Sequence, residues 1–69
     1  MYTINLKSEL VKKINDHEIY RSETRIYNEY TDKFVGKKQV FYDVYCKDGG
    51  DIIESHKSLR EAIKFAKSL

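Results

Sequence analysis

The side chains that could do chemistry in this sequence are few and widely spaced. Cys46 and His56 stand on either side of a predicted turn, and a Cys–His pair can form a nucleophile or half of a metal site. His17 lies between Asp16 and Glu18, as an oriented general base would. A metal site needs three or four ligands, however, and no second pair of ligands stands near the first. We therefore expect a structural cysteine, surface histidines, and neither a metal nor a cofactor.

Recognisable catalytic motifs are missing from the sequence. Its three glycines, Gly36, Gly49 and Gly50, fit neither a phosphate-binding loop nor a dinucleotide fingerprint. No Gly-x-Ser-x-Gly nucleophile elbow can be written either. A chain of 69 residues has little material with which to bury a core and also enclose a deep substrate cleft. We expect a protein that is not an enzyme.

Composition places the chain among ordinary globular domains. With 41% hydrophobic and 35% charged residues it is too apolar for a disordered segment, so residues 1–69 are expected to form one domain. The net charge of +2, from 13 basic and 11 acidic residues, is smaller than a chain that relies on phosphate contacts usually carries. Cys46 is the one cysteine, and neither a signal peptide nor a membrane-spanning run is visible. These features predict a reducing, cytoplasmic location, in the host cytoplasm if the gene belongs to a phage, and no membrane partner.

The C-terminal half has the clearest predicted elements. Residues 40–46 are β-branched and aromatic, as in a strand, and residues 47–50 can form the tight turn that leads to a returning strand at 51–55. Ser58 and Glu61 make a capping box, which predicts that a helix begins there. Its apolar stripe has the spacing of one helix face and consists of Leu59, Ala62, Ile63 and Ala66.

The N-terminal half is harder to read. A third strand at about residues 23–31 is expected to pair with residues 40–46 across a turn at Gly36, although it can also begin near Glu18 with a bulge inside it. Leu6, Leu10 and Ile14 lie four residues apart, which favours a helix ending at residues 15–16, and the alternative is a short strand at 2–6 before a shorter helix. The expected fold is α+β, in the order α-β-β-β-α: a three-stranded antiparallel meander with a C-terminal helix packed on one face and a short N-terminal helix.

Two surfaces are candidates for binding. Every second residue of the strand at 40–46 faces the same side. If the side that carries Val40, Tyr42 and Val44 lies under the C-terminal helix, the other face of the sheet presents aromatic anchors for a protein partner, with charged residues at its rim. The residues of this predicted protein-binding site are Tyr27, Phe41, Tyr45, Asp43 and Lys38. Exposed aromatic residues on a sheet can also stack unpaired bases or pair across a two-fold axis in a homodimer. The alternative is that the N-terminal segment covers them.

The second surface is a basic stripe on the C-terminal helix. Arg60, Lys64 and Lys67 fall on one helix face and Lys57 precedes it, so this row could follow the phosphates of a nucleic acid. The alternative is the ordinary solvated face of an amphipathic helix, because lysines near a helix C-terminus also suit its dipole.

The hairpin followed by a helix at residues 40–67, with its Asp-Gly-Gly turn and Ser-Leu-Arg-Glu-Ala-Ile-Lys-Phe-Ala helix, resembles the ending of many small phage and mobile-element proteins. Those include anti-defence proteins, such as anti-CRISPR inhibitors that occlude a bacterial nuclease, and DNA-binding accessory domains of some integrases. The resemblance implies a small binding module, an inhibitor or adaptor that covers a surface of a larger protein such as a defence nuclease. A nucleic-acid-binding accessory domain is the alternative. The resemblance covers less than half of the chain and assigns no role to any single residue.

Overall fold

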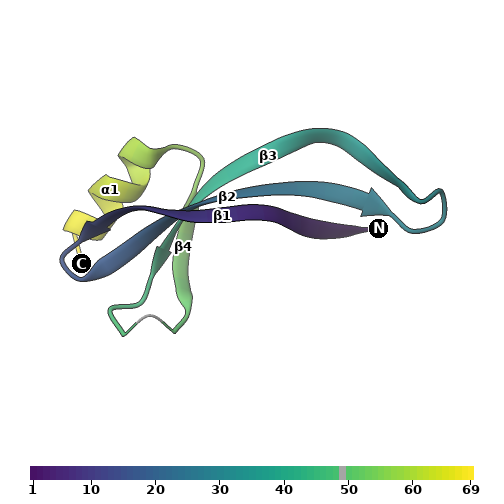
Figure 1. Ribbon diagram of the computed structural model, residues 1–69. Helices are drawn as coiled ribbons and strands as arrows, with labels where there is room; N and C mark the ends of the chain where they lie inside the picture. Colours follow the sequence, from purple (N-terminus) through teal and green to yellow (C-terminus); the bar gives the residue numbers. More distant parts are fainter. Residues whose placement is uncertain (49) are drawn as a thin grey trace.

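The computed structural model describes residues 1–48 and 50–69 and contains a four-stranded antiparallel sheet followed by a helix (Figure 1). The elements are β1 (Tyr2–Ile14), β2 (His17–Asn28), β3 (Lys33–Tyr45), β4 (Ile52–His56) and α1 (Leu59–Lys67). Each strand pairs with the next one along the chain, in the order β1-β2-β3-β4. The predicted α+β class is confirmed, with its antiparallel sheet and its C-terminal helix. The three-strand count and the N-terminal helix are wrong.

The segment predicted as an N-terminal helix is the 13-residue strand β1. The four-residue spacing of Leu6, Leu10 and Ile14 does not distinguish a helix from a strand, because residues i and i+4 share a face in both. A helix face also needs apolar residues three positions on, and Glu9 and Lys13 stand there instead. The alternative is right about a strand at residues 2–6, which lie in β1, and wrong about the shorter helix after it.

Residues expected to end that helix form the turn between β1 and β2. Asn15 and Asp16 have φ angles of 49° and 68°, and Ile14 is paired with His17 across them. Two central residues with positive φ are typical of the type I′ turn that joins antiparallel strands. Asn and Asp tolerate this conformation better than most residues, so the local sequence suits the hairpin.

The pairing of β2 with β3 contains a bulge, as the longer of the two predicted strands did. β2 begins at His17, near the earlier of the two expected starts, and its register with β3 shifts between Thr24 and Ile26. Gly36, expected in the connecting turn, lies inside β3 opposite this shift, with a φ of 75°. The turn itself precedes Lys33, so the expectation that Gly36 supplies it is wrong.

The predicted hairpin between β3 and β4 is confirmed. The backbone N–H of Cys46 donates to the carbonyl of Asp51 at 2.8 Å, which closes the loop between the two strands. β3 starts earlier than the expected residue 40, at Lys33. Gly49, which was expected in the turn, lies outside the described residues.

Helix α1 begins as the capping pattern predicts. The side chain of Ser58 accepts a hydrogen bond from the backbone N–H of Glu61 at 3.2 Å. The buried core consists of Ala62 and Ala66 from the helix, packed with Ile19 and Val44 from the sheet. Five partly buried residues surround it: Ile14, Tyr42, Leu59, Ile63 and Phe65. The helix therefore covers one face of the sheet, at one end.

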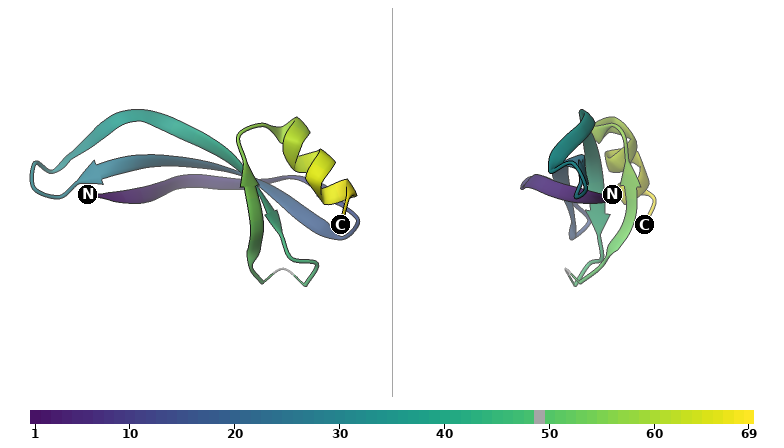
Figure 2. Two further views of the ribbon diagram at one scale, coloured as in Figure 1. Left: turned by 180° about the vertical axis from the view of Figure 1, so that it is seen from behind. Right: turned by 90° about the vertical axis from the view of Figure 1, so that its right-hand side faces the viewer.

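The rest of the sheet extends well beyond the helix. The molecule measures 44 × 22 × 16 Å, and three strands project together on the side away from α1 (Figures 1 and 2). We call this projection the arm; it comprises residues 2–5, 24–28 and 33–39. The N-terminus lies at the arm and the C-terminus lies near α1 (Figure 1). Within the described part of the chain, no helix has the length and apolar character needed to cross a membrane.

Matched substitutions at two isoleucines of β2 test where the core lies. Ile19 is fully buried, whereas Ile26 on the arm is 40% exposed. Ile19→Val should lower the free energy of unfolding by about 1 kcal/mol, a fall in Tm of about 5 °C, because it leaves a small cavity. Ile26→Val should change it by less than about 0.5 kcal/mol. Urea and thermal unfolding measure both, and equal effects would contradict a core confined to the helix end.

Candidate functional site

The side of the sheet away from α1 forms an open face. Tyr42 and Val44 pack toward the helix. Because side chains alternate along a strand, Phe41, Asp43 and Tyr45 point to the opposite side. The N-terminal segment, which the alternative interpretation placed over this side, lies in the sheet as β1, beside β2. Within the described residues the open face therefore has no helix over it.

Aromatic side chains gather on the open face. Tyr20 of β2 is paired with Asp43, and its ring lies 5.1 Å from that of Tyr45 in an edge-to-face arrangement. Burial raises the pKa of the Tyr45 hydroxyl, and the nearby Asp43 carboxylate and Tyr20 add to the rise. Leu10 of β1 is paired with Tyr20 and is 51% exposed, so it extends the apolar surface onto the edge strand. Sequence reasoning missed Tyr20 and Leu10, because only the strand register places them here.

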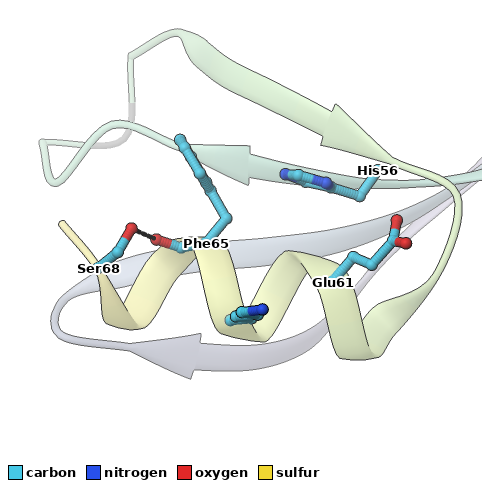
Figure 3. A pocket seen from close by; sticks show the side chains of 5 residues that line it. His56, Glu61, Phe65 and Ser68 are labelled. Atoms are coloured by element: carbon cyan, nitrogen blue, oxygen red, sulfur yellow. Dashed lines mark hydrogen bonds between the residues drawn. The ribbon is translucent and has the colours of Figure 1, made fainter.

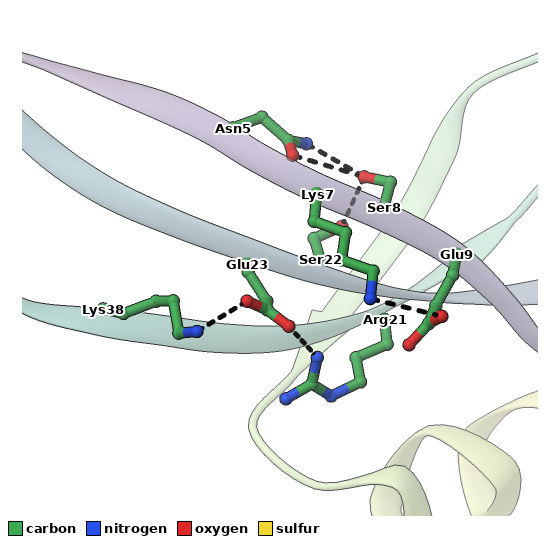
Figure 4. A network of polar contacts seen from close by, with 8 residues as sticks. All are labelled: Asn5, Lys7, Ser8, Glu9, Arg21, Ser22, Glu23 and Lys38. Atoms are coloured by element: carbon green, nitrogen blue, oxygen red, sulfur yellow. Dashed lines mark hydrogen bonds and ion pairs between the residues drawn. The ribbon is translucent and has the colours of Figure 1, made fainter.

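A row of polar side chains crosses all four strands at the centre of this face. The Ser22 hydroxyl donates to Oδ2 of Asp43 at 2.5 Å, and the Ser55 hydroxyl donates to Oδ1 at 2.6 Å. The Ser8 hydroxyl lies 3.4 Å from that of Ser22 and continues the row onto β1 (Figure 4). Asp43 is only 7% exposed. It is therefore a central, hydrogen-bonded carboxylate rather than the rim charge expected from the sequence.

Tyr27 lies apart from this cluster, on the arm. Its ring packs between those of Tyr2 and Phe34, tilted to the first and edge-to-face with the second, with centroid distances of 5.6 and 5.5 Å. The guanidinium carbon of Arg25 lies 5.1 Å from the centre of the Phe34 ring. Ser22 is the residue of β2 that is paired with Phe41, and Tyr27 lies five positions further along that strand. Five residues of strand span roughly 16 Å. The structure does not bring it together with Phe41 and Tyr45.

Lys38 also lies apart from Asp43, in an ion-pair cluster. Its Nζ is 2.8 Å from Oε1 of Glu23, and the Arg21 guanidinium binds the other oxygen of the same carboxylate (Figure 4). Glu23 is paired with Val40, so this cluster belongs to the face on which α1 lies. Hydrogen bonds from Lys38 first, and then from Arg21, lower the pKa of Glu23 from 4.5 to about 2.

The basic residues of the C-terminal region remain at the surface. Lys57, Arg60, Lys64 and Lys67 are exposed, and within the described chain none of them forms an ion pair. Lys64 lines a hollow of about 340 Å³ between α1 and β4; the other lining residues are His56, Glu61, Phe65 and Ser68 (Figure 3). The His56 ring packs against Phe65 at 5.3 Å. Its Nε2 lies 3.2 Å from Oε1 of Glu54 but has no hydrogen bond of good geometry.

The residues first considered for chemistry have separate environments. His17 donates from Nδ1 to the carbonyl of Tyr45 at 2.8 Å, which links the start of β2 to the end of β3. Cys46 is a partly buried free thiol. Across residues 1–48 and 50–69, no group of three or more His, Cys, Asp or Glu side chains is arranged to hold a metal ion.

No family model, no curated protein and no solved structure matches this chain. What the chain can bind is therefore inferred from its own geometry, above all from that of the open face.

The Glu23 cluster makes stability depend on pH. Because the pKa of Glu23 is about 2 in the folded chain against 4.5 ordinarily, its ionised form favours folding. That contribution is complete above about pH 5 and is lost as the pH falls toward 2. Glu23→Gln should therefore reduce the urea midpoint most near neutral pH and least near pH 2. Lys38→Gln, which removes the largest cause of the shift, should reduce the same pH dependence. A difference in midpoint between the wild type and the Glu23→Gln variant that stays constant across this range would contradict the assignment.

Proposed function

We propose that this chain is a small non-enzymatic protein-binding module, a phage-type inhibitor or adaptor. It acts by covering a functional surface of a larger protein, such as a defence nuclease, in the cytoplasm of the cell. The observation that carries the proposal is the half-buried aromatic cluster on the open face, where no described helix covers it. Its members are Tyr20, Phe41 and Tyr45.

The composition of the open face suits a protein partner. Tyr and Phe are enriched in the cores of protein interfaces, where they supply large contact areas. Here neighbouring strands hold the rings in place, and Tyr20 and Tyr45 already contact each other. Binding therefore requires little additional ordering of these side chains, which lowers the entropy cost of forming an interface.

The edge strand β1 enlarges this surface. Leu6, Leu10 and Val11 are all exposed on it. Register shifts occur at Leu6 and Val11, and bulges of this kind, together with charged side chains, protect an edge from indiscriminate strand pairing. The apolar edge therefore supports contact with a shaped partner surface. Self-association into a homodimer is the competing outcome, and sedimentation at two concentrations separates the two.

The proposal predicts a loss of binding when the aromatic residues are truncated. Phe41→Ala combined with Tyr45→Ala should weaken capture of the partner from a host lysate by about thirtyfold or more, as expected for hot-spot anchors that contribute about 2 kcal/mol. Quantitative pull-down with immobilised protein measures the loss. The matched control is Tyr2→Ala with Phe34→Ala, which removes two aromatic rings from the arm and should leave capture unchanged. A folded Phe41/Tyr45 double variant that captures the same partner equally well would disprove the assignment.

A second function is supported by the basic surface of α1. Lys57, Arg60, Lys64 and Lys67 keep their charges free of ion pairs within the described chain, so they are available for phosphates. We propose a nucleic-acid-binding accessory domain as the alternative. The near balance of charge over the whole chain makes it the weaker of the two.

The alternative predicts salt-sensitive binding that depends on α1. Labelled single- and double-stranded DNA and RNA should bind at low salt, with an affinity that falls steeply as salt rises, because bound phosphates release counterions. Fluorescence anisotropy measures this, and Lys64→Glu with Lys67→Glu should abolish it. The control is Lys12→Glu with Lys13→Glu, the same charge change on exposed residues of β1. No binding at low salt, or equal losses from the two double variants, would count against the basic stripe.

A further inference from the structure

We propose that the centre of the open face binds the guanidinium group of an arginine supplied by the partner protein. The Asp43 carboxylate accepts its hydrogen bonds, and the neighbouring aromatic rings contact its planar surface. This inference rests on the proposed protein-binding function and names the chemistry by which the partner is recognised.

The charge of Asp43 is unbalanced within the described chain. It is 7% exposed, and its hydrogen-bond partners, the hydroxyls of Ser22 and Ser55, are neutral. Within residues 1–48 and 50–69, no Lys, Arg or His side chain lies within ion-pair distance of it. The neighbouring Arg21 belongs to the other face, where it binds Glu23. A buried carboxylate is costly unless it is paired, so the site favours a cation from outside the chain.

The Asp43 carboxylate also has unused hydrogen-bonding capacity. Each oxygen of Asp43 accepts one hydrogen bond, from Ser55 at Oδ1 and from Ser22 at Oδ2. A carboxylate oxygen has about two acceptor positions, so one remains on each oxygen. A guanidinium group presents two parallel N–H donors with the spacing of the two carboxylate oxygens, whereas an ammonium group acts as a single point charge. The pattern of unused acceptors therefore favours arginine over lysine.

Aromatic side chains surround the Asp43 carboxylate on the open face. Phe41 lies two residues before Asp43 and Tyr45 two residues after it, on the same face of β3. Tyr20, on the neighbouring strand β2, is paired with Asp43. Guanidinium groups stack on aromatic rings and are more weakly hydrated than ammonium groups, so they enter such a site at lower cost. The molecule already contains one arrangement of this kind, in which Arg25 lies over Phe34 on the arm.

The test uses the wild-type protein and matched peptides. Isotope-labelled protein is titrated with acetyl-Gly-Arg-Gly-amide at constant ionic strength, and its amide resonances are followed by NMR. Saturable shifts in the millimolar range, centred on Phe41, Asp43, Tyr45 and Ser55, support the proposal. The citrulline tripeptide, which has nearly the same shape without the charge, and the lysine tripeptide should each bind about tenfold more weakly or worse. An absent response to the arginine peptide, or equal responses to arginine and citrulline, would overturn the guanidinium site.

Substitution of the acceptor completes the test. Asp43→Asn keeps the shape of the side chain and removes its charge, and it should abolish the response to the arginine peptide. Asp48→Asn is the control for a general loss of negative charge, because that residue is exposed and should leave the response unchanged. If Asp43→Asn does not fold, the comparison of arginine with citrulline on the wild type decides the question alone.

The two proposals fail in different ways. Specific arginine binding by the wild type, together with unchanged partner capture by the Phe41/Tyr45 double variant, would support the guanidinium site and disprove the open face as the partner interface. Capture that is lost in that variant, without any response to the arginine peptide, would support the interface and overturn the guanidinium site.

Discussion

Helix α1 packs Ala62 and Ala66 onto Ile19 and Val44, and this small contact decides which part of the sheet is covered. A helix of nine residues is about 14 Å long, against a molecule 44 Å long. It can therefore cover one face of the sheet at one end and no more. The opposite face and the arm stay uncovered by necessity, and a sheet with so little covering must use its own side chains to keep these surfaces ordered.

Two sets of side-chain contacts keep the arm and the open face ordered. On the arm, the Tyr27 ring packs between those of Tyr2 and Phe34, so aromatic contacts join three strands far from the core. On the open face, hydrogen bonds from Ser22 and Ser55 hold Asp43 and tie β2, β3 and β4 together. Such contacts hold neighbouring strands together where no helix packs on them. The open face ordered in this way is the surface for which we propose a protein partner.

In the interface that we propose, the polar and aromatic parts of the open face have complementary roles. There the rings of Tyr20, Phe41 and Tyr45 would supply contact area, which is largely indifferent to the partner's identity. The Asp43 carboxylate among them would add selectivity, because a partner without a cation in the matching place would leave that charge buried and unpaired. A small module can in this way combine affinity from a few rings with specificity from one charge.

Local sequence determined the elements whose signals lie within a few residues. The cap at Ser58, the stripe containing Ala62 and Ala66, and the β3–β4 hairpin depend on neighbouring side chains, and each was predicted. The sequence also placed Phe41, Asp43 and Tyr45 on one face, since alternation along a strand is itself local.

What the tertiary structure alone decided was the pairing of distant segments. The four-residue spacing of apolar residues in β1 is common to helices and strands, and the segment forms a strand because it pairs with β2. The register of β3 with β2 and β4 places Tyr20 and Ser55 beside Asp43, which is buried there. The same pairing places Tyr27 on the arm. Register arises from hydrogen bonds between residues far apart in the chain, and no spacing within one segment can reveal it.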